Sequence, residues 1–282
     1  MGAAIDLPSI NIPSLLRKHH LSPRKGLGQN FLIEDSYLQQ IVQSAEISPE
    51  DTVLEVGAGA GSLTRWLAQS ARRVVAVELD IQLIPLLKEV IGEGGNIQIV
   101  AGDILQLDPA KLMGSDGYVV AANIPYYITS ALFRHLLEAT VKPRRMIITV
   151  QQEVAERICA GPGALNLLAL SIQVYGNPRT VLSIPASAFY PSPKVDSTTL
   201  RVDLYPQPLI ASNQLNSFFK LSKAGFSQKR KMLHNALAAG LGWTKEKVEP
   251  LLEQAHIDPQ RRAQTLNMDE WRRLTEIYNS LK

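Results

Sequence analysis

The chain has 282 residues, of which 45% are hydrophobic and 20% charged, and its formal net charge is +3. This composition excludes a disordered chain and predicts a globular protein, long enough for one large domain and a smaller one. It holds no run of 18 apolar residues and no secretory signal pattern. Cys159 is the only cysteine, so no internal disulfide can form, and we expect a cytoplasmic protein with no membrane partner.

Basic residues concentrate toward the two ends of the chain. Residues 201–282 hold 13 of the 29 Lys and Arg but only 8 of the 26 Asp and Glu. A second basic cluster, of Arg17, Lys18, Arg24 and Lys25, lies near the start. Basic ends around a near-neutral middle favour a polyanionic partner, although solvated helix faces would give the same count.

Short apolar runs alternate with helical patterns between residues 36 and 160. The predicted strands are 52–56, 73–78, 97–100, 118–122 and 146–150, and the predicted helices lie near 36–45, 62–70, 81–91, 129–139 and 151–160. The strands are almost continuously apolar, as expected when helices cover both faces of a parallel sheet. This alternation predicts an α/β fold with a doubly wound sheet.

The pattern changes in the second half of the chain. Further strands are predicted at 167–175, 179–184 and 196–204, and the Pro-rich segment 205–208 reads as a linker. Helical patterns follow near 213–224, 229–240, 244–254 and 269–280. We therefore predict a basic N-terminal segment (1–35), an α/β catalytic domain (36–205) and a small all-α domain (209–282).

A glycine-rich loop follows the first predicted strand of the sheet. Glu55 precedes Gly57, Gly59 and Gly61, a G-x-G-x-G loop in which glycines allow close approach of a ligand. Ser62 stands where a dinucleotide fold has its third glycine, so the loop is similar instead to the S-adenosylmethionine site of class I methyltransferases.

Two acids strengthen that prediction. Glu78 ends the second strand, where a carboxylate would meet the hydroxyls of a ribose, and Asp103 follows the third, where it could accept from an adenine amino group. Either acid alone is equally typical of a helix cap or a surface position. Their order at successive strand ends favours a bound S-adenosylmethionine.

The tetrapeptide Asn123-Ile124-Pro125-Tyr126 follows the fourth strand. Alone it reads as a turn, since Asn and Pro are common turn residues. Beside a methyl donor, the Asn123 side-chain oxygen and the carbonyl of Ile124 or Pro125 would accept the N–H groups of a flat amine. Tyr126 or Tyr127 would stack on a flipped base. The tetrapeptide does not distinguish amines of DNA, RNA or protein.

With these motifs the chain resembles the bacterial ribosomal RNA adenine N6,N6-dimethyltransferase family from about residue 23 to 271. The resemblance begins at Lys25-Gly26-Leu27-Gly28-Gln29-Asn30-Phe31-Leu32. It implies a class I (Rossmann-like) methyltransferase fold and a cofactor site for S-adenosyl-L-methionine made by Asn30, Leu32, Gly57, Glu78, Asp103 and Asn123. It also implies that Asn123, Pro125 and Tyr126 contact the target base.

Two later segments fit the same family. Residues 184–197 match its loop over the substrate, which makes Phe189 the second stacking ring and fourth catalytic residue, although a Pro-rich connector would look similar. Lys229, Arg230 and Lys231 match its RNA-binding triplet, although a solvated helix start would carry the same charges. Residues 160–170 depart from the family, since the loop there is shorter and less polar.

The sequence therefore predicts dimethylation of N6 on two adjacent adenosines near the 3′ end of 16S RNA. The expected partner is the small ribosomal subunit or its precursor, so the protein could also take part in maturation of that subunit. We expect a monomer that holds no metal. The alternatives are a 23S RNA adenine N6-methyltransferase, a non-catalytic RNA-binding assembly factor and an NAD-dependent oxidoreductase. The missing third glycine counts against the last of these.

Overall fold

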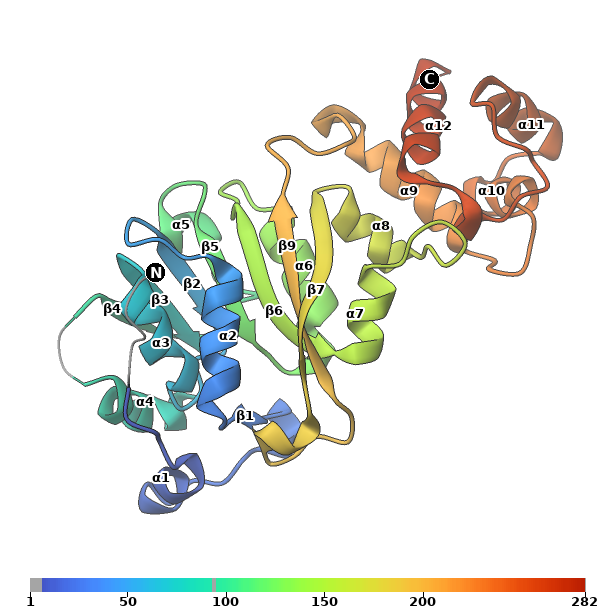
Figure 1. Ribbon diagram of the computed structural model, residues 1–282. Helices are drawn as coiled ribbons and strands as arrows, with labels where there is room; N and C mark the ends of the chain where they lie inside the picture. Colours follow the sequence, from blue (N-terminus) through green and yellow to red (C-terminus); the bar gives the residue numbers. More distant parts are fainter. Residues whose placement is uncertain (1–6, 93–94, 282) are drawn as a thin grey trace. The chain divides into compact units, whose positions relative to one another are not determined.

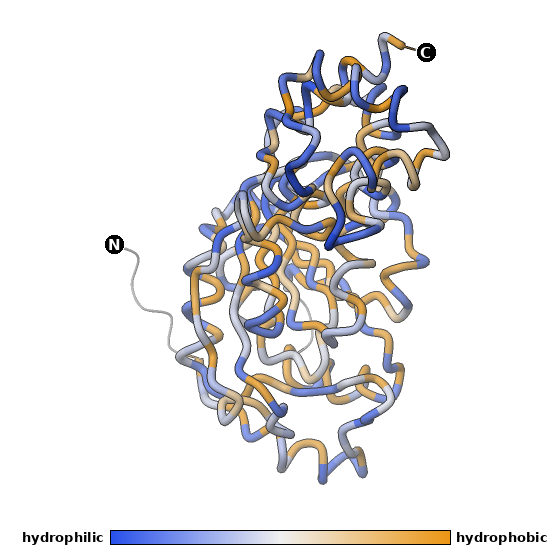
Figure 2. Tube along the Cα trace, turned by 90° about the vertical axis from the view of Figure 1, so that its right-hand side faces the viewer, coloured by the Kyte–Doolittle hydropathy of each residue, from blue (hydrophilic) through white to orange (hydrophobic). Residues whose placement is uncertain are grey.

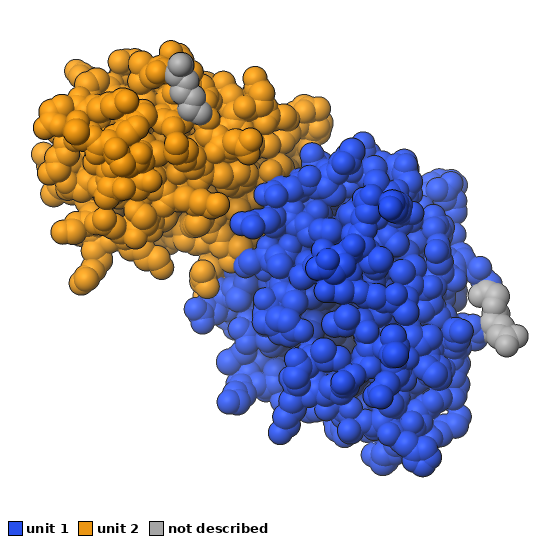
Figure 3. All heavy atoms as spheres, turned by 180° about the vertical axis from the view of Figure 1, so that it is seen from behind, with its two compact units in different colours: residues 1–155, 179–204 blue, residues 156–178, 205–282 orange. Residues whose placement is uncertain are grey.

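The computed structural model describes residues 7–92 and 95–281, so residues 1–6 of the predicted N-terminal segment and residue 282 lie outside it. Contacts divide the chain into two compact units, coloured separately in Figure 3. Unit 1 comprises residues 1–155 and 179–204, and unit 2 comprises residues 156–178 and 205–282. This division differs from the expected domains because residues 156–178 pack with the C-terminal helices.

Unit 1 is built on a seven-stranded sheet with the order β4-β3-β2-β5-β6-β9-β7 (Figure 1). The strands are β2 (Thr52–Val56), β3 (Arg73–Glu78), β4 (Ile97–Ala101), β5 (Val119–Asn123), β6 (Arg145–Gln151), β7 (Gly176–Ile184) and β9 (Ser197–Leu204). Strands β2 to β6 are parallel, and β9 runs antiparallel to β6. Chain order reverses between β2 and β5, which is where ligands bind in open α/β sheets.

Helices cover both faces of this sheet. In Figure 1, α2 (Asp35–Ala45) and α3 (Ser62–Ser70) cross the front face and α6 (Thr129–Leu137) lies behind. The other helices near unit 1 are α1 (Ile12–Lys18), α4 (Ile84–Ile91), α5 (Pro109–Met113) and α7 (Gln152–Ile158), the last of which crosses the unit boundary. Central strand residues such as Val53, Val74 and Val119 are fully buried, and Figure 2 shows hydrophobic stretches inside this unit. The predicted doubly wound α/β fold is confirmed.

A second, two-stranded sheet joins distant segments of unit 1. Strand β1 (Phe31–Leu32) pairs antiparallel with β8 (Phe189–Tyr190), so that Leu32 faces Phe189. The backbone N–H of Ile33 extends the pairing by donating to the carbonyl of Ala188 over 2.9 Å. The N-terminal motif and the 184–197 loop are thereby held against each other.

Unit 2 is helical. It contains α8 (Leu167–Gln173), α9 (Leu215–Phe226), α10 (Leu233–Leu241), α11 (Lys245–Gln254) and α12 (Met268–Ser280). Helices α9 and α10 pack closely, because a Cβ at Gly240 would lie 2.5 Å from the Cα of Ala224. A capping box between Asn267 and Glu270 begins α12, and Trp271 is fully buried behind it.

One predicted element of this unit was wrong, and another begins later than predicted. In the predicted strand 167–175, residues 167–173 form helix α8 instead, because the Asn166 side chain caps the backbone N–H of Ala169 over 3.0 Å. An unbroken apolar run does not distinguish a buried strand from a buried helix. The helix predicted from 229 begins at Leu233, since three cations in a first turn oppose the helix dipole.

None of the described helices combines the length and apolar character needed to cross a membrane. Within residues 7–92 and 95–281, no group of three or more His, Cys, Asp or Glu side chains is placed to hold a metal ion.

Candidate active site

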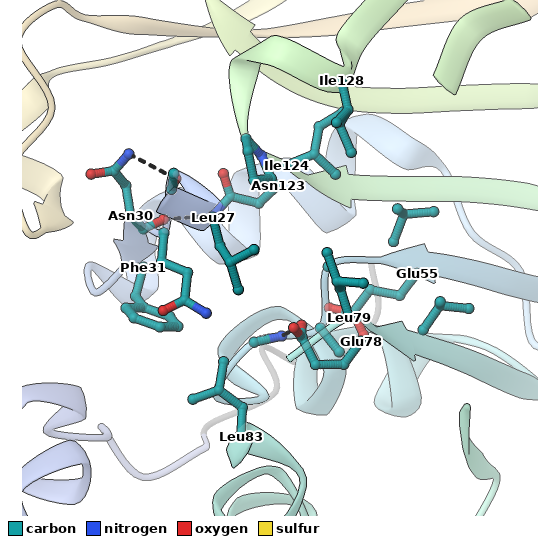
Figure 4. A pocket seen from close by; sticks show the side chains of 18 of the residues that line it. Leu27, Asn30, Phe31, Glu55, Glu78, Leu79, Leu83, Asn123, Ile124 and Ile128 are labelled. Atoms are coloured by element: carbon teal, nitrogen blue, oxygen red, sulfur yellow. Dashed lines mark hydrogen bonds between the residues drawn. The ribbon is translucent and has the colours of Figure 1, made fainter. Parts of the chain in front are cut away.

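A pocket of about 240 Å³ lies at the carboxyl end of the sheet in unit 1. Every residue that the sequence assigned to catalysis or cofactor binding lines it: Asn30, Leu32, Gly57, Glu78, Asp103, Asn123, Pro125, Tyr126 and Phe189. In Figure 4, Asn30 and Asn123 lie on one side, and Glu78 and Leu79 lie on the other. These residues meet because the strand order changes direction between the parallel strands β2 and β5, which brings the carboxyl ends of β2, β3 and β5 to one edge of the sheet.

Backbone of the glycine loop forms one wall of the pocket. Gly57 and Gly59 have φ values of 76° and 57°, in the left-handed region that other residues avoid. A Cβ at Gly57 would lie 3.4 Å from the backbone oxygen of Asn123, and one at Gly59 would lie 3.2 Å from the Phe31 ring. The loop thus brings bare backbone close to the pocket, where side chains would intrude.

Glu78 is held by two backbone donors. The N–H of Gly59 donates to its Oε2 and the N–H of Asp80 donates to its Oε1, each over 2.7 Å. A carboxylate has about four acceptor positions, so Glu78 can still accept hydrogen bonds from a ligand. Burial raises the pKa of Glu78, with a smaller contribution from the Asp80 charge, while the two N–H donors oppose the rise.

Asp103 lies on the same side of the pocket, after β4. Its Oδ1 accepts the backbone N–H of Leu105 over 3.0 Å, which fixes the carboxylate at the pocket wall. The apolar side chains of Leu79 and Leu83 lie along the same wall (Figure 4). Acceptors beside apolar side chains suit a purine ring with an exocyclic amine.

Asn123 ends β5 on the opposite side of the pocket. Its Nδ2 donates to the backbone oxygen of Asn30 over 3.5 Å, which leaves Oδ1 as an acceptor. The carbonyl of Pro125 already accepts the N–H of Ile128 over 3.2 Å. Of the two carbonyls that the sequence left open, that of Ile124 is therefore the better acceptor for a ligand.

Two tyrosines follow this strand in different environments. The hydroxyl of Tyr126 is 2.8 Å from the hydroxyl of Ser197 on β9, which fixes the ring. Burial raises the pKa of Tyr126, and the bond to Ser197 opposes the rise. Tyr127 is 64% exposed at the pocket rim. The held ring of Tyr126 is the better platform for a base inside the pocket.

Glu55 was quoted in the glycine motif but given no role from sequence. It is 1% exposed, lines the pocket, and its Oε2 has no hydrogen-bond partner in the described chain. Burial raises its pKa to about 8. Nothing in the motif distinguishes an ionised acid from a protonated one, because that depends on burial.

The basic triplet belongs to unit 2, whereas the pocket residues belong to unit 1. Lys229, Arg230 and Lys231 are exposed in the turn between α9 and α10. Three adjacent exposed cations form a surface that attracts phosphates without reading sequence.

The strand order, the glycine loop and the acid at the end of β3 define a class I methyltransferase fold. The model of the family described as ribosomal RNA adenine dimethylase matches residues 20–280. The chain belongs to this family.

Relatives and solved structures agree with that assignment. Ribosomal RNA small subunit methyltransferase A of Dehalococcoides mccartyi strain 195 is 44% identical over 98% of this chain and 96% of the relative, and that of Alkaliphilus metalliredigens is 40% identical over 93% and 94%. A dimethyladenosine transferase structure from Plasmodium falciparum covers 89% of this chain and 98% of its own, at 25% identity and a TM-score of 0.77. The structure of the 23S rRNA methyltransferase ErmE covers 88% and 99%, at 27% identity and a TM-score of 0.71.

Proposed function

We propose that this protein transfers methyl groups from S-adenosyl-L-methionine to N6 of two adjacent adenosines near the 3′ end of 16S RNA. One observation carries the proposal. The carboxylate of Glu78, held by two backbone N–H groups, and the amide of Asn123 line a single pocket where the strand order changes direction. The names of the small-subunit relatives favour 16S over 23S RNA as the substrate.

The residues present fit S-adenosylmethionine. Glu78 offers acceptors to ribose hydroxyls, Asp103 offers an acceptor to the adenine amine, and the glycine loop leaves room for close approach. Glu55, whose buried Oε2 has no hydrogen-bond partner among the described residues, adds a further polar residue to the lining of this pocket. When bound, the cofactor supplies an electrophilic methyl group on a sulfonium.

The protein positions the acceptor amine. Asn123 Oδ1 and the Ile124 carbonyl accept its two N–H groups, which draws the nitrogen lone pair out of conjugation with the ring. Tyr126, fixed by Ser197, stacks on one face of the adenine, and Phe189 packs against the other. Such positioning is a large catalytic contribution in itself. The N6 proton leaves to solvent.

The basic turn of unit 2 serves a different step in this proposal. Lys229, Arg230 and Lys231 hold RNA phosphates, while the pocket of unit 1 reads the base. We expect a monomer to be active on a small subunit or its precursor. A role of this protein in maturation of the small subunit is compatible with this activity.

Calorimetry and a two-substrate assay test the proposal. We expect the protein to bind S-adenosylhomocysteine and not NAD, and to transfer labelled methyl groups to small-subunit particles and not to large-subunit particles. Methylation of large-subunit RNA alone would support the 23S alternative. Binding of particles without any methyl transfer would support the non-catalytic assembly factor.

A further inference from the structure

The N-terminal segment is connected to the cofactor pocket through Asp80, a residue outside the pocket lining. Asp80 is 4% exposed, and its charge is almost completely removed from water. Its Oδ1 accepts from Arg24 Nη1 over 3.2 Å, and its Oδ2 accepts from Gln29 Nε2 over 2.9 Å. Two side chains of the N-terminal segment therefore converge on one buried carboxylate.

The same residue also holds the pocket's acid. The backbone N–H of Asp80 donates to Glu78 Oε1 over 2.7 Å, and the Asp80 Oδ1 accepts the N–H of Gln82 over 3.2 Å. The side-chain bonds to Arg24 and Gln29 thus fix the peptide that orients Glu78. A shift of Asp80 would move one of the two donors that hold the Glu78 carboxylate.

The segment itself is organised around this contact. Gln29 Oε1 accepts the backbone N–H of Arg24 over 2.8 Å, so both donors to Asp80 are held by the same turn. Gln29 directly precedes Asn30, whose backbone oxygen accepts from Asn123. The segment from Arg24 to Asn30 consequently contacts Asp80, which bonds to the acid of β3, and the amide that ends β5.

Arg24 also partly offsets the charge that Asp80 places beside Glu78. A second carboxylate next to Glu78 opposes its ionisation, and Asp80 contributes to the raised pKa of Glu78 after the larger effect of burial. Arg24 lies 3.2 Å from Asp80 and compensates that charge. The side chain of Arg24 is 53% exposed, so the pair is screened by solvent and acts mainly through geometry.

We propose that Asp80, with Arg24 and Gln29, is a positioning residue that sets the affinity for the ribose of the cofactor by holding Glu78 in place. The inference rests on the proposed function, because it takes Glu78 to accept from ribose hydroxyls. Asp80 itself is not among the residues that line the pocket. The bonds from Arg24 and Gln29 to Asp80 thereby support the ribose site.

The test compares two ligands in Asp80→Asn and Arg24→Ala, both away from the pocket lining. Calorimetry measures Kd for S-adenosylhomocysteine and for its 2′,3′-dideoxy analogue, which lacks the hydroxyls. We expect Asp80→Asn to weaken the binding of S-adenosylhomocysteine about tenfold, near the scale of one hydrogen bond to a charged group. We expect Arg24→Ala to weaken it about threefold, because the side chain of Arg24 is half exposed and its pair with Asp80 is screened by solvent. Binding of the dideoxy analogue should change less than twofold.

Lys18→Ala is the matched control. Lys18 anchors the same N-terminal segment by its bond to Glu89, over 2.6 Å, on helix α4 rather than at the acid of β3. We expect this variant to bind both ligands as the unmodified protein does. Thermal unfolding without ligand checks that each variant is folded.

Each outcome decides a separate point. Equal losses for both ligands in Asp80→Asn, or no loss for either, would overturn the positioning role. If Asp80→Asn does not fold, the same comparison in Arg24→Ala decides. Failure of the unmodified protein to bind S-adenosylhomocysteine would instead overturn the proposed function.

Discussion

Leu32 and Phe189 face each other across the two-stranded sheet of β1 and β8. One comes from the N-terminal cofactor motif and the other from the loop at 184–197, and both are almost completely buried while lining the pocket. The pairing explains how two segments distant in sequence contribute to one wall. It also means that the ring of Phe189 serves both the core and the site.

Phe189→Ala should therefore cost stability and activity together. Loss of a buried ring destabilises a protein by about 3–5 kcal/mol, and urea unfolding would measure it here. Phe189→Leu fills most of the space without an aromatic face, so we expect it to regain most of the stability but less than a tenth of the methyl transfer, the scale expected for stacking on a base. Equal activity of Phe189→Leu and the unmodified protein would argue against stacking.

Asn123→Ala tests the acceptor for the target amine. We expect a fall in kcat of about 100-fold or more, as for the loss of one positioned hydrogen-bonding group in an active site. Binding of S-adenosylhomocysteine and of RNA should remain within a few-fold, because Glu78 and the basic turn are unchanged. Single-turnover kinetics separates the two effects, and a normal rate of transfer would contradict the role given to Asn123.

Glu55→Gln tests the buried acid. The folded pKa of Glu55 is about 8 against an ordinary value of 4.5, so the folded state keeps a proton that the unfolded chain releases between these pH values. The stability that Glu55 contributes is thus complete below pH 4.5 and is lost as pH rises toward 8.

Glutamine has no such titration. The free energy of unfolding of Glu55→Gln, relative to the unmodified protein, should therefore increase from pH 5 to pH 8 by a few kcal/mol. Urea unfolding without ligand at both pH values measures this difference. A difference that is the same at both would show that Glu55 titrates normally.

The basic triplet predicts that RNA binding depends on the salt concentration. Replacing Lys229, Arg230 and Lys231 by Ala should weaken RNA binding at low salt. It should also reduce the slope of log K against log salt by about 2, since each phosphate contact contributes about 0.7–0.9. Arg134→Ala, on helix α6 of unit 1 with a 70% exposed side chain, is the control and should leave the slope unchanged. An unchanged slope in the triple variant would exclude phosphate contacts from this turn.

The sequence predicted those parts of the fold that local chemistry determines. The bounds of β2 and β3 coincide with the predicted 52–56 and 73–78, because apolar β-branched runs end there at a glycine loop and an acid. Helix α8 was missed because its apolar run carries no periodicity that separates it from a strand.

The site was predictable where a motif follows a strand, and not where two distant side chains meet. Glu78, Asp103 and Asn123 could be placed from strand order alone. Tyr126 bonds to Ser197 and Gln29 bonds to Asp80, and each pair meets only in the folded chain. The sequence around these residues therefore does not predict the two bonds.

Mapping methyl groups by mass spectrometry tests the central claim most directly. Small-subunit particles that lack the modification are incubated with the protein and S-adenosylmethionine, and the 16S RNA is digested and sequenced by mass. We expect N6,N6-dimethyladenosine at two adjacent adenosines near the 3′ end and at no other position. Unmodified 16S RNA together with methylated 23S RNA would contradict the account.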